Sequence, residues 1–141
     1  MTFFEQMLLG HFIGDYILQN KWMAYRKGTN YLPCLTHCLL YTLAVCSFSP
    51  FNIWWVLVVF LSHFFIDKFS LADKWLKLIN GRSLTDFLAF GHMEISDNLM
   101  QANKENYRIL RGSFTGIVYT AVDNTMHILL MVLGAYYLRL L

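Results

Sequence analysis

Long apolar runs, separated by short polar stretches, dominate the hydropathy pattern of this chain. The runs lie at about 2–19, 32–48, 51–69 and 117–138. A helix that crosses a bilayer needs about 20 apolar residues, with a range of about 17–25. The pattern therefore predicts an all-α polytopic membrane protein, a small bundle of about four transmembrane helices. We expect one integral membrane domain over residues 1–141, with a loop at about 70–116.

Composition agrees with a membrane protein. Hydrophobic residues make up 57% of the chain and charged residues only 14%, whereas a soluble domain usually has about 25% charged residues. The net charge is only +2, which gives no case for nucleic-acid binding. The partner that composition predicts is the lipid bilayer.

The basic residues predict the topology. Ten of the 11 Lys and Arg residues fall in the two polar stretches after the first and third runs or, for Lys68, at the very end of the third run. They are Lys21, Arg26, Lys27, Lys68, Lys74, Lys77, Arg82, Lys104, Arg108 and Arg111. Loops rich in Lys and Arg stay in the cytoplasm, so we expect both termini on the non-cytoplasmic side of a multi-pass protein.

Three of the apolar runs carry a histidine and an aspartate four residues apart. The pairs are His11 with Asp15, His63 with Asp67, and Asp123 with His127. Residues at i and i+4 share one helix face. The order reverses in the last pair, where the predicted helix direction also reverses, so each aspartate should lie nearer the cytoplasm than its histidine. His37, near the start of the second run, would add a fourth face at a similar depth.

Such residues are costly inside a membrane. An aspartate at mid-membrane costs about 2.5–3.5 kcal/mol, so three would cost roughly 8–10 kcal/mol. Hydrogen bonds between membrane helices return about 0.6 kcal/mol each on average. A purely structural role is therefore the weaker interpretation, and we expect a shared functional site.

A metal centre is the first interpretation of that site. Imidazole and carboxylate ligands suit Zn, Mn or Fe. The candidate ligands are His11, Asp15, His37, His63, Asp67, Asp123 and His127, enough even for two ions. Of these, Asp15, Asp67 and Asp123 are also the candidate catalytic residues.

Residues around these ligands would support them. Gln19 and Asn124 could hold ligands in place, and Cys38 is a more remote ligand candidate. Lys21 and Lys68 would meet an anionic substrate near the mouth of the site. A metal that polarises an oxygen and activates water favours hydrolysis, here of a lipid-linked or phosphorylated substrate approached from the cytoplasm.

Other interpretations stay open. The same groups could form the proton or ion relay of a small transporter or channel subunit, where Asp and His chains are usual. Four helices are few for a transporter, so a homodimer would be needed, and Gly10-x-x-x-Gly14 would permit close helix packing. A non-enzymatic membrane factor of a phage or its host is a third interpretation. Haem bound by paired histidines would leave the aspartates unexplained.

The motifs resemble those of a known family. They are H-x2-GD-x3-Q followed by KW at His11–Trp22, a single histidine at His37, SH-x3-DK at Ser62–Lys68, and D-N-x2-H at Asp123–His127. Together they resemble a family of small bacterial and phage membrane proteins catalogued as domain of unknown function 3307. The resemblance covers nearly the whole chain and implies a bacterial inner-membrane location, but it implies no activity. Asn124 replaces a more usual Gln, and the stretch at about 79–111 looks longer than in the family.

Overall fold

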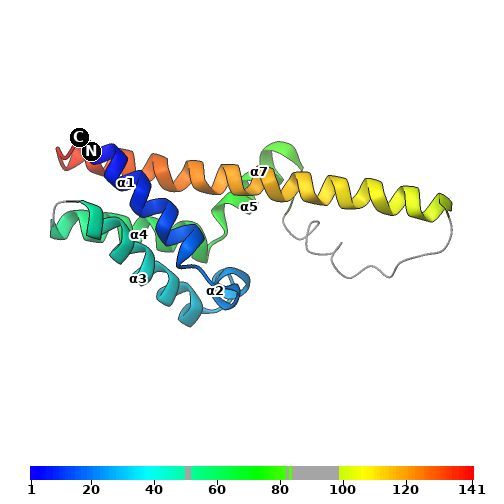
Figure 1. The fold of residues 1–141 in the computed structure, drawn as a ribbon, viewed down its shortest axis with the longest axis horizontal. Coiled ribbons are helices and arrows are strands. Elements are labelled where there is room, and N and C mark those ends of the chain that lie inside the picture. Colours follow the sequence, from blue (N-terminus) through cyan, green and yellow to red (C-terminus); the bar gives the residue numbers. More distant parts are fainter. Residues whose placement is uncertain (50–51, 82, 84–98) are drawn as a thin grey trace. The chain divides into compact units, whose positions relative to one another are not determined.

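Every regular element that the structure describes is a helix. The computed structural model describes residues 1–49, 52–81, 83 and 99–141 (Figure 1). The chain divides into two compact units. The first unit contains Met1–Ser70 and Thr125–Leu141, and the second contains Leu71–Asn124. The all-α prediction is confirmed for the described residues.

The first unit is built from five helical elements and the end of a sixth. They are α1 (Phe3–Phe12), the π-helical turn η1 (Ile13–Ile17), α2 (Lys21–Arg26), α3 (Tyr31–Phe48), α4 (Ile53–Lys68) and, from Thr125 on, α7 (Leu99–Tyr137).

Short polar side chains start these helices. Thr2 and Glu5 form a reciprocal capping box at the start of α1. Asparagines precede the next three helices: the side chain of Asn20 accepts a hydrogen bond from Met23 N, and Asn30 and Asn52 act in the same way at α3 and α4. Such caps satisfy amide groups that the first helical turn leaves unpaired, so each polar link directs the chain into the next apolar helix.

Helix α3 is the centre of the first unit. α1, η1, α2 and α4 all pack against it (Figure 1). The approach of α1 and η1 depends on two glycines, because a Cβ at Gly10 would lie 2.5 Å from Val45 Cα and one at Gly14 would lie 3.0 Å from Tyr41 Cα. The Gly10-x-x-x-Gly14 face is therefore used within the chain, and it lends no support to a homodimer.

The core of the first unit joins both ends of the chain. Buried residues of α1, α3, α4 and α7 form one apolar cluster, made of Met7, Tyr41, Val45, Trp55, Val59, Met131 and Ala135. Phe3, Leu138 and Leu140 pack against this cluster. The two termini consequently lie side by side (Figure 1).

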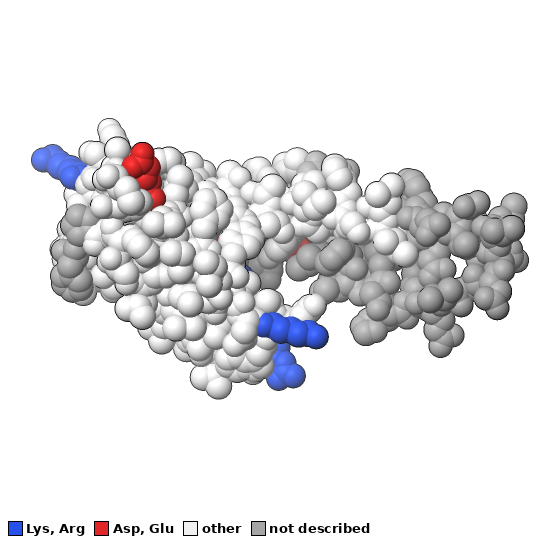
Figure 2. Space-filling view, viewed as in Figure 1, with Lys and Arg blue, Asp and Glu red and all other residues white. Residues whose placement is uncertain are grey.

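The outside of the first unit is apolar. α3 and α4 each expose large aliphatic or aromatic side chains at four-residue spacing: Leu35, Leu39 and Leu43, and Leu57, Leu61 and Phe65. In the view of Figure 2 the surface of this unit is almost entirely uncharged, and charged side chains stand out only near the termini and near α2. Such a surface is typical of contact with lipid rather than with water.

Two helices of the described chain are long and apolar enough to cross a membrane. They are α3 and the segment Gly112–Tyr137 of α7, and a third candidate arises if α4 and α5 (Leu71–Asn80) count together as one broken span. These findings suggest a membrane location with a bilayer as partner. α1 and η1, with 10 and five residues, are not among the candidates.

Helix boundaries differ from the expected ones at two places. The first apolar run was expected to be one regular helix to about residue 19, but Leu18 N bonds to Ile13 O in the i→i+5 pattern of a π-turn, so Gln19 lies beyond the helix. The last helix was expected from about 117 but begins at Leu99. Hydropathy marks where α7 becomes apolar, whereas good helix formers continue the helix into the polar sequence before it.

The second unit contains α5 and the part of α7 before Thr125. Ser83 Oγ donates to Asp73 Oδ2 at 3.4 Å. The predicted loop at about 70–116 is thus partly helical. Residues 82 and 84–98 of the stretch that looked longer than in the family lie outside the described residues.

We predict that Gly10→Ala destabilises the first unit. The added methyl group would meet the α3 backbone at Val45 Cα, which cannot give way as a flexible side chain would, and overpacking of this kind costs about 1–3 kcal/mol. The free energy of unfolding in detergent measures the effect. Leu39→Ala, on the exposed face of α3, is the control, and an equal or larger loss there would contradict the close approach at Gly10.

Candidate metal centre

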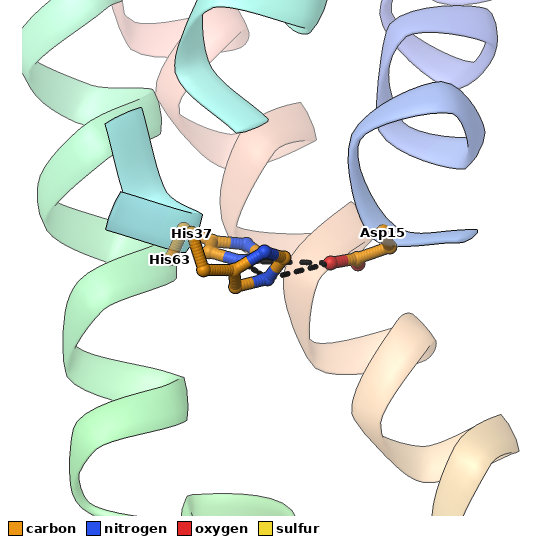
Figure 3. A group of neighbouring side chains, drawn as sticks. All are labelled: Asp15, His37 and His63. Carbon is orange, nitrogen blue, oxygen red and sulfur yellow. Dashed lines mark hydrogen bonds and ion pairs between the residues drawn. The ribbon is translucent and has the colours of Figure 1, made fainter. Parts of the chain in front are cut away.

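Three segments of the first unit bring polar side chains to one point. Asp15 comes from η1, His37 from α3 and His63 from α4, and the two imidazole rings turn their nitrogens toward the Asp15 carboxylate (Figure 3). Asp67 follows His63 by one turn of α4 and joins them from the same helix face. We call Asp15, His37, His63 and Asp67 the His/Asp cluster.

The distances within the cluster suit a shared cation. His63 Nε2 lies 2.9 Å from His37 Nε2, and Asp15 Oδ1 lies 3.1 Å from His37 Nε2 and 3.5 Å from His63 Nε2. Metal–ligand bonds of about 2.0–2.1 Å in a tetrahedral site put the donor atoms about 3.3 Å apart. Asp15, His37 and His63 are one of two groups in the described chain whose donor atoms could hold a metal ion.

The second group adjoins the first. It consists of Cys38, His63 and Asp67, all buried, with donor atoms within 4.8 Å of one another. Asp67 Oδ2 also lies 3.3 Å from His37 Nε2 and 3.2 Å from His63 Nε2. Because His63 belongs to both groups, they are parts of one cluster rather than two separate sites.

The cluster has more acceptors than hydrogen atoms to satisfy them. Asp15 Oδ1 and Asp67 Oδ2 face the Nε2 atoms of His37 and His63, yet neither oxygen has a hydrogen bond of good geometry from the described residues. An ionised carboxylate only accepts, and each neutral imidazole has a single N–H. Buried polar groups are normally satisfied, and this set of acceptors could hold a cation.

Aromatic contacts orient the histidine rings. His63 stacks on Tyr41 with ring centroids 3.6 Å apart and lies 4.1 Å from the His127 ring. Within the described chain, Nδ1 of His37 and Nδ1 of His63 have no hydrogen-bond partner. Packing, rather than hydrogen bonding at Nδ1, therefore sets the ring of His63.

A lysine that the sequence interpretation did not include reaches the cluster. Lys27 Nζ lies 2.9 Å from Asp67 Oδ1, and the exposed fractions of the two side chains are 13% and 0%. Lys27 follows α2 directly, while Asp67 is the penultimate residue of α4. The pair links the end of α2 to the last turn of α4. It also neutralises a fully buried carboxylate, which would otherwise be costly to desolvate.

His11 lies at the edge of the cluster. Its Nδ1 is 2.8 Å from Tyr41 Oη and 3.5 Å from Asp15 Oδ2, and Tyr41 Oη donates to Met131 Sδ at 3.3 Å. His11 belongs to neither of the two three-residue groups. It contacts Asp15 from the core side, where it could orient the carboxylate.

The last predicted pair is divided between the two units. His127 is buried in the first unit, with Nε2 3.8 Å from Asp67 Oδ1. Asp123 and Asn124 belong to the second unit, where Asn124 Nδ2 donates to Thr120 O at 2.7 Å. A role for Asp123 or Asn124 at the cluster therefore stays a prediction.

The other predicted supporting residues differ in their distance from the cluster. Gln19 Nε2 lies 3.0 Å from His37 Nε2, so the amide contacts a member of the cluster directly. Lys68 lies over the Tyr31 ring at 3.9 Å, with Nζ 3.5 Å from Gly28 O. Lys21 lies over the Tyr25 ring at 5.8 Å. Of these three lysines, Lys27 is the one that forms an ion pair with the cluster.

The sequence contained partial signals for the residues that the prediction missed. Tyr41 stands four residues after His37 and therefore on the same face of α3. Lys27 stands in a basic stretch, but nothing in the pattern distinguishes it from Lys21 or Arg26. Cys38 was foreseen only as a remote candidate, although it follows His37 directly.

Comparison with known proteins identifies the family. The model of a family described as "Protein of unknown function (DUF3307)" matches residues 3–140. The chain belongs to the DUF3307 family. No curated protein matches the chain, and no solved structure matches it.

The family motifs quoted above gain a physical meaning in this DUF3307 chain. Gly14 and Asp15 of the first motif lie in the π-turn, where the glycine allows contact with Tyr41 and the aspartate meets His37. His63 and Asp67 of the third motif are both in the cluster. Three motifs far apart in sequence thus meet around α3.

We predict that Tyr41→Phe lowers the stability of the first unit by about 1–2 kcal/mol. The change keeps the ring that stacks on His63 but removes the hydroxyl between His11 and Met131, and a net hydrogen bond contributes about 0.5–1.5 kcal/mol. Chemical unfolding in detergent measures the loss. Tyr136→Phe, on an exposed side chain, should change stability little, and equal effects would contradict the buried hydroxyl network.

Proposed function

We propose that this DUF3307 protein is a membrane-embedded metal-binding protein with Asp15, His37 and His63 as ligands. One observation carries the proposal. Four atoms that can each accept a hydrogen bond lie 2.9–3.5 Å apart in five pairs, and the two imidazoles have too few N–H groups to satisfy all four. The atoms are Asp15 Oδ1, His37 Nε2, His63 Nε2 and Asp67 Oδ2. A cation satisfies all of them together. It also neutralises the carboxylates that an apolar bundle would otherwise penalise.

The donor set favours particular metals. Two imidazoles and a carboxylate suit Zn, Mn or Fe, and three protein ligands with a further position open are typical of catalytic rather than structural zinc sites. Cys38 and Asp67 adjoin the set. Asp67 is the fourth ligand or the residue next to the open position, held in place by Lys27.

Hydrolysis of a lipid-linked or phosphorylated substrate is the reaction that such a centre supports best. A divalent ion there would supply Lewis acidity and activate water. Asp67, beside His63, could accept a proton, and His11 would hold the Asp15 carboxylate in position. Asp123 is proposed as a third catalytic carboxylate and His127 as a further ligand, as their spacing on α7 indicates.

The proposed topology places the centre near the cytoplasmic face of a bacterial inner membrane. Four apolar segments form the bundle, and α1 with η1 enters the bilayer without the length of a regular span. The termini lie together at one end of the first unit. The basic residues of α2 come after α1 and η1, and Lys68 ends α4 and contacts Gly28 after α2. Lys and Arg mark the cytoplasmic side, so this arrangement supports termini on the other side.

The metal proposal predicts about one ion per chain in detergent-purified protein, lost in His63→Ala. Elemental analysis measures the ratio, and turnover of a phosphoester in detergent should disappear after chelation and return when metal is restored. His11→Gln is the matched control: it removes a buried histidine that is outside both three-residue groups, so the ion should remain. A wild-type protein without bound metal after purification in zinc-supplemented buffer would exclude the centre.

A relay is the second candidate because the polar groups form a continuous chain. Contacts of 3.5 Å or less lead from Tyr41 through His11, Asp15, His37 and Asp67 to Lys27. Chains of Asp and His serve proton pathways in transporters. This arrangement supports a proton- or ion-coupled transporter or channel subunit without requiring a metal.

The relay predicts proton flux in sealed proteoliposomes that is lost in Asp15→Asn. The amide would keep the size of the side chain but remove the carboxylate between His11 and His37. A pH-sensitive dye inside the vesicles measures the flux, and Leu39→Ala on the lipid-facing surface is the control. Wild-type protein that moves no protons, but turns over substrate in detergent, would leave the metal enzyme as the surviving candidate.

A further inference from the structure

Lys27 is a mostly buried cation that lies at the part of the cluster most exposed to solvent. The side chains of His37, His63 and Asp67 are 0–1% exposed, whereas those of Asp15 and Lys27 are 10% and 13% exposed. A ligand that reaches the cluster from the aqueous phase therefore meets Asp15 and Lys27 before it meets the histidines.

The net charge of the cluster together with Lys27 changes sign when a divalent ion binds. Asp15, Asp67 and Lys27 together carry one negative charge while the histidines are neutral. A divalent ion turns this into one positive charge. A buried positive charge is as unfavourable as a buried negative one unless a counter-ion joins it, so the loaded centre is complementary to a single bound anion.

The surroundings of Lys27 contain further positive charge. Lys68 Nζ contacts the carbonyl of Gly28, the residue that follows Lys27. Arg26 precedes Lys27 in the same turn of chain. The remaining acidic residue of this unit, Glu5, caps the start of α1 next to the chain termini instead.

We infer that the metal-loaded centre binds an oxyanion of the phosphate class and that Lys27 is the residue that holds it. This inference rests on the metal centre proposed above. Lysine is a common point-charge partner of phosphate, and its flexible stem lets Nζ move from Asp67 toward a ligand at the partly exposed edge. The anion is either a free phosphate group or the phosphate of a lipid head group at the membrane surface.

Cobalt-loaded protein gives a readout that does not depend on turnover. The visible absorption of Co(II) changes when an anion enters or adjoins its coordination sphere. One titration uses inorganic phosphate in detergent, and a second uses phosphatidic acid in phosphatidylcholine nanodiscs, with phosphatidylcholine alone as the blank. A response to phosphate identifies a soluble anion, whereas a response to phosphatidic acid alone identifies a lipid head group, and either result supports the inference.

Lys27→Met tests the residue. We expect the variant to retain about one cobalt per chain. It should bind the anion at least about tenfold more weakly, because the charge-assisted hydrogen bond from the ammonium group to the anion is lost. Lys27→Arg, which keeps the charge, should retain most of the affinity. Arg139→Met removes one positive charge near the C-terminus and should leave the affinity unchanged.

Specific results would overturn the inference. Equal anion affinity in wild type and Lys27→Met would show that Lys27 does not hold the anion. A cobalt spectrum that neither phosphate nor phosphatidic acid changes would show that the centre does not bind this class. Both results leave the metal centre standing, whereas a wild-type protein that takes up no cobalt overturns the metal centre and this inference together.

Discussion

Two carboxylates inside an apolar bundle are the constraint on which the rest of the site depends. Asp67 is fully buried and Asp15 almost so, and each would be costly without a compensating charge. The fold surrounds them with two imidazoles and an ammonium group. Lys27 neutralises Asp67, and His37 and His63 face both carboxylates. The capacity to hold a cation follows from the negative charge that remains.

That convergence depends in turn on close backbone packing. Asp15 reaches His37 because Gly10 and Gly14 let α1 and η1 approach the backbone of α3. The π-turn adds one residue to the helical turn between His11 and Gln19, and the helix ends before Gln19. Gln19 therefore contacts His37 from the non-helical segment that follows η1. π-turns are frequent at functional sites, and here the turn carries the one partly exposed carboxylate of the cluster.

Helical periodicity was enough to predict part of this arrangement. The i, i+4 spacing placed His63 and Asp67 on one face, and both are in the cluster. The same rule placed His11 with Asp15, but the ring of His11 turns to Tyr41, a contact that depends on how α1 packs on α3. The role of Lys27 could not be predicted from spacing, because its contact with Asp67 depends on how the turn after α2 packs against the end of α4. Hydropathy located α3 to within a residue but missed the polar start of α7, where helix propensity continues beyond the apolar segment.

The proton count distinguishes the two candidate functions. A relay must supply the cluster with protons, yet the Nε2 atoms of His37 and His63 lie only 2.9 Å apart. Protonating both imidazoles would direct two N–H groups of like-charged rings at each other, which is unfavourable. With one N–H between the rings, Asp15 Oδ1 and Asp67 Oδ2 remain short of donors. A divalent ion removes the deficit without any proton at this point, and for this reason the geometry favours a metal centre over a relay.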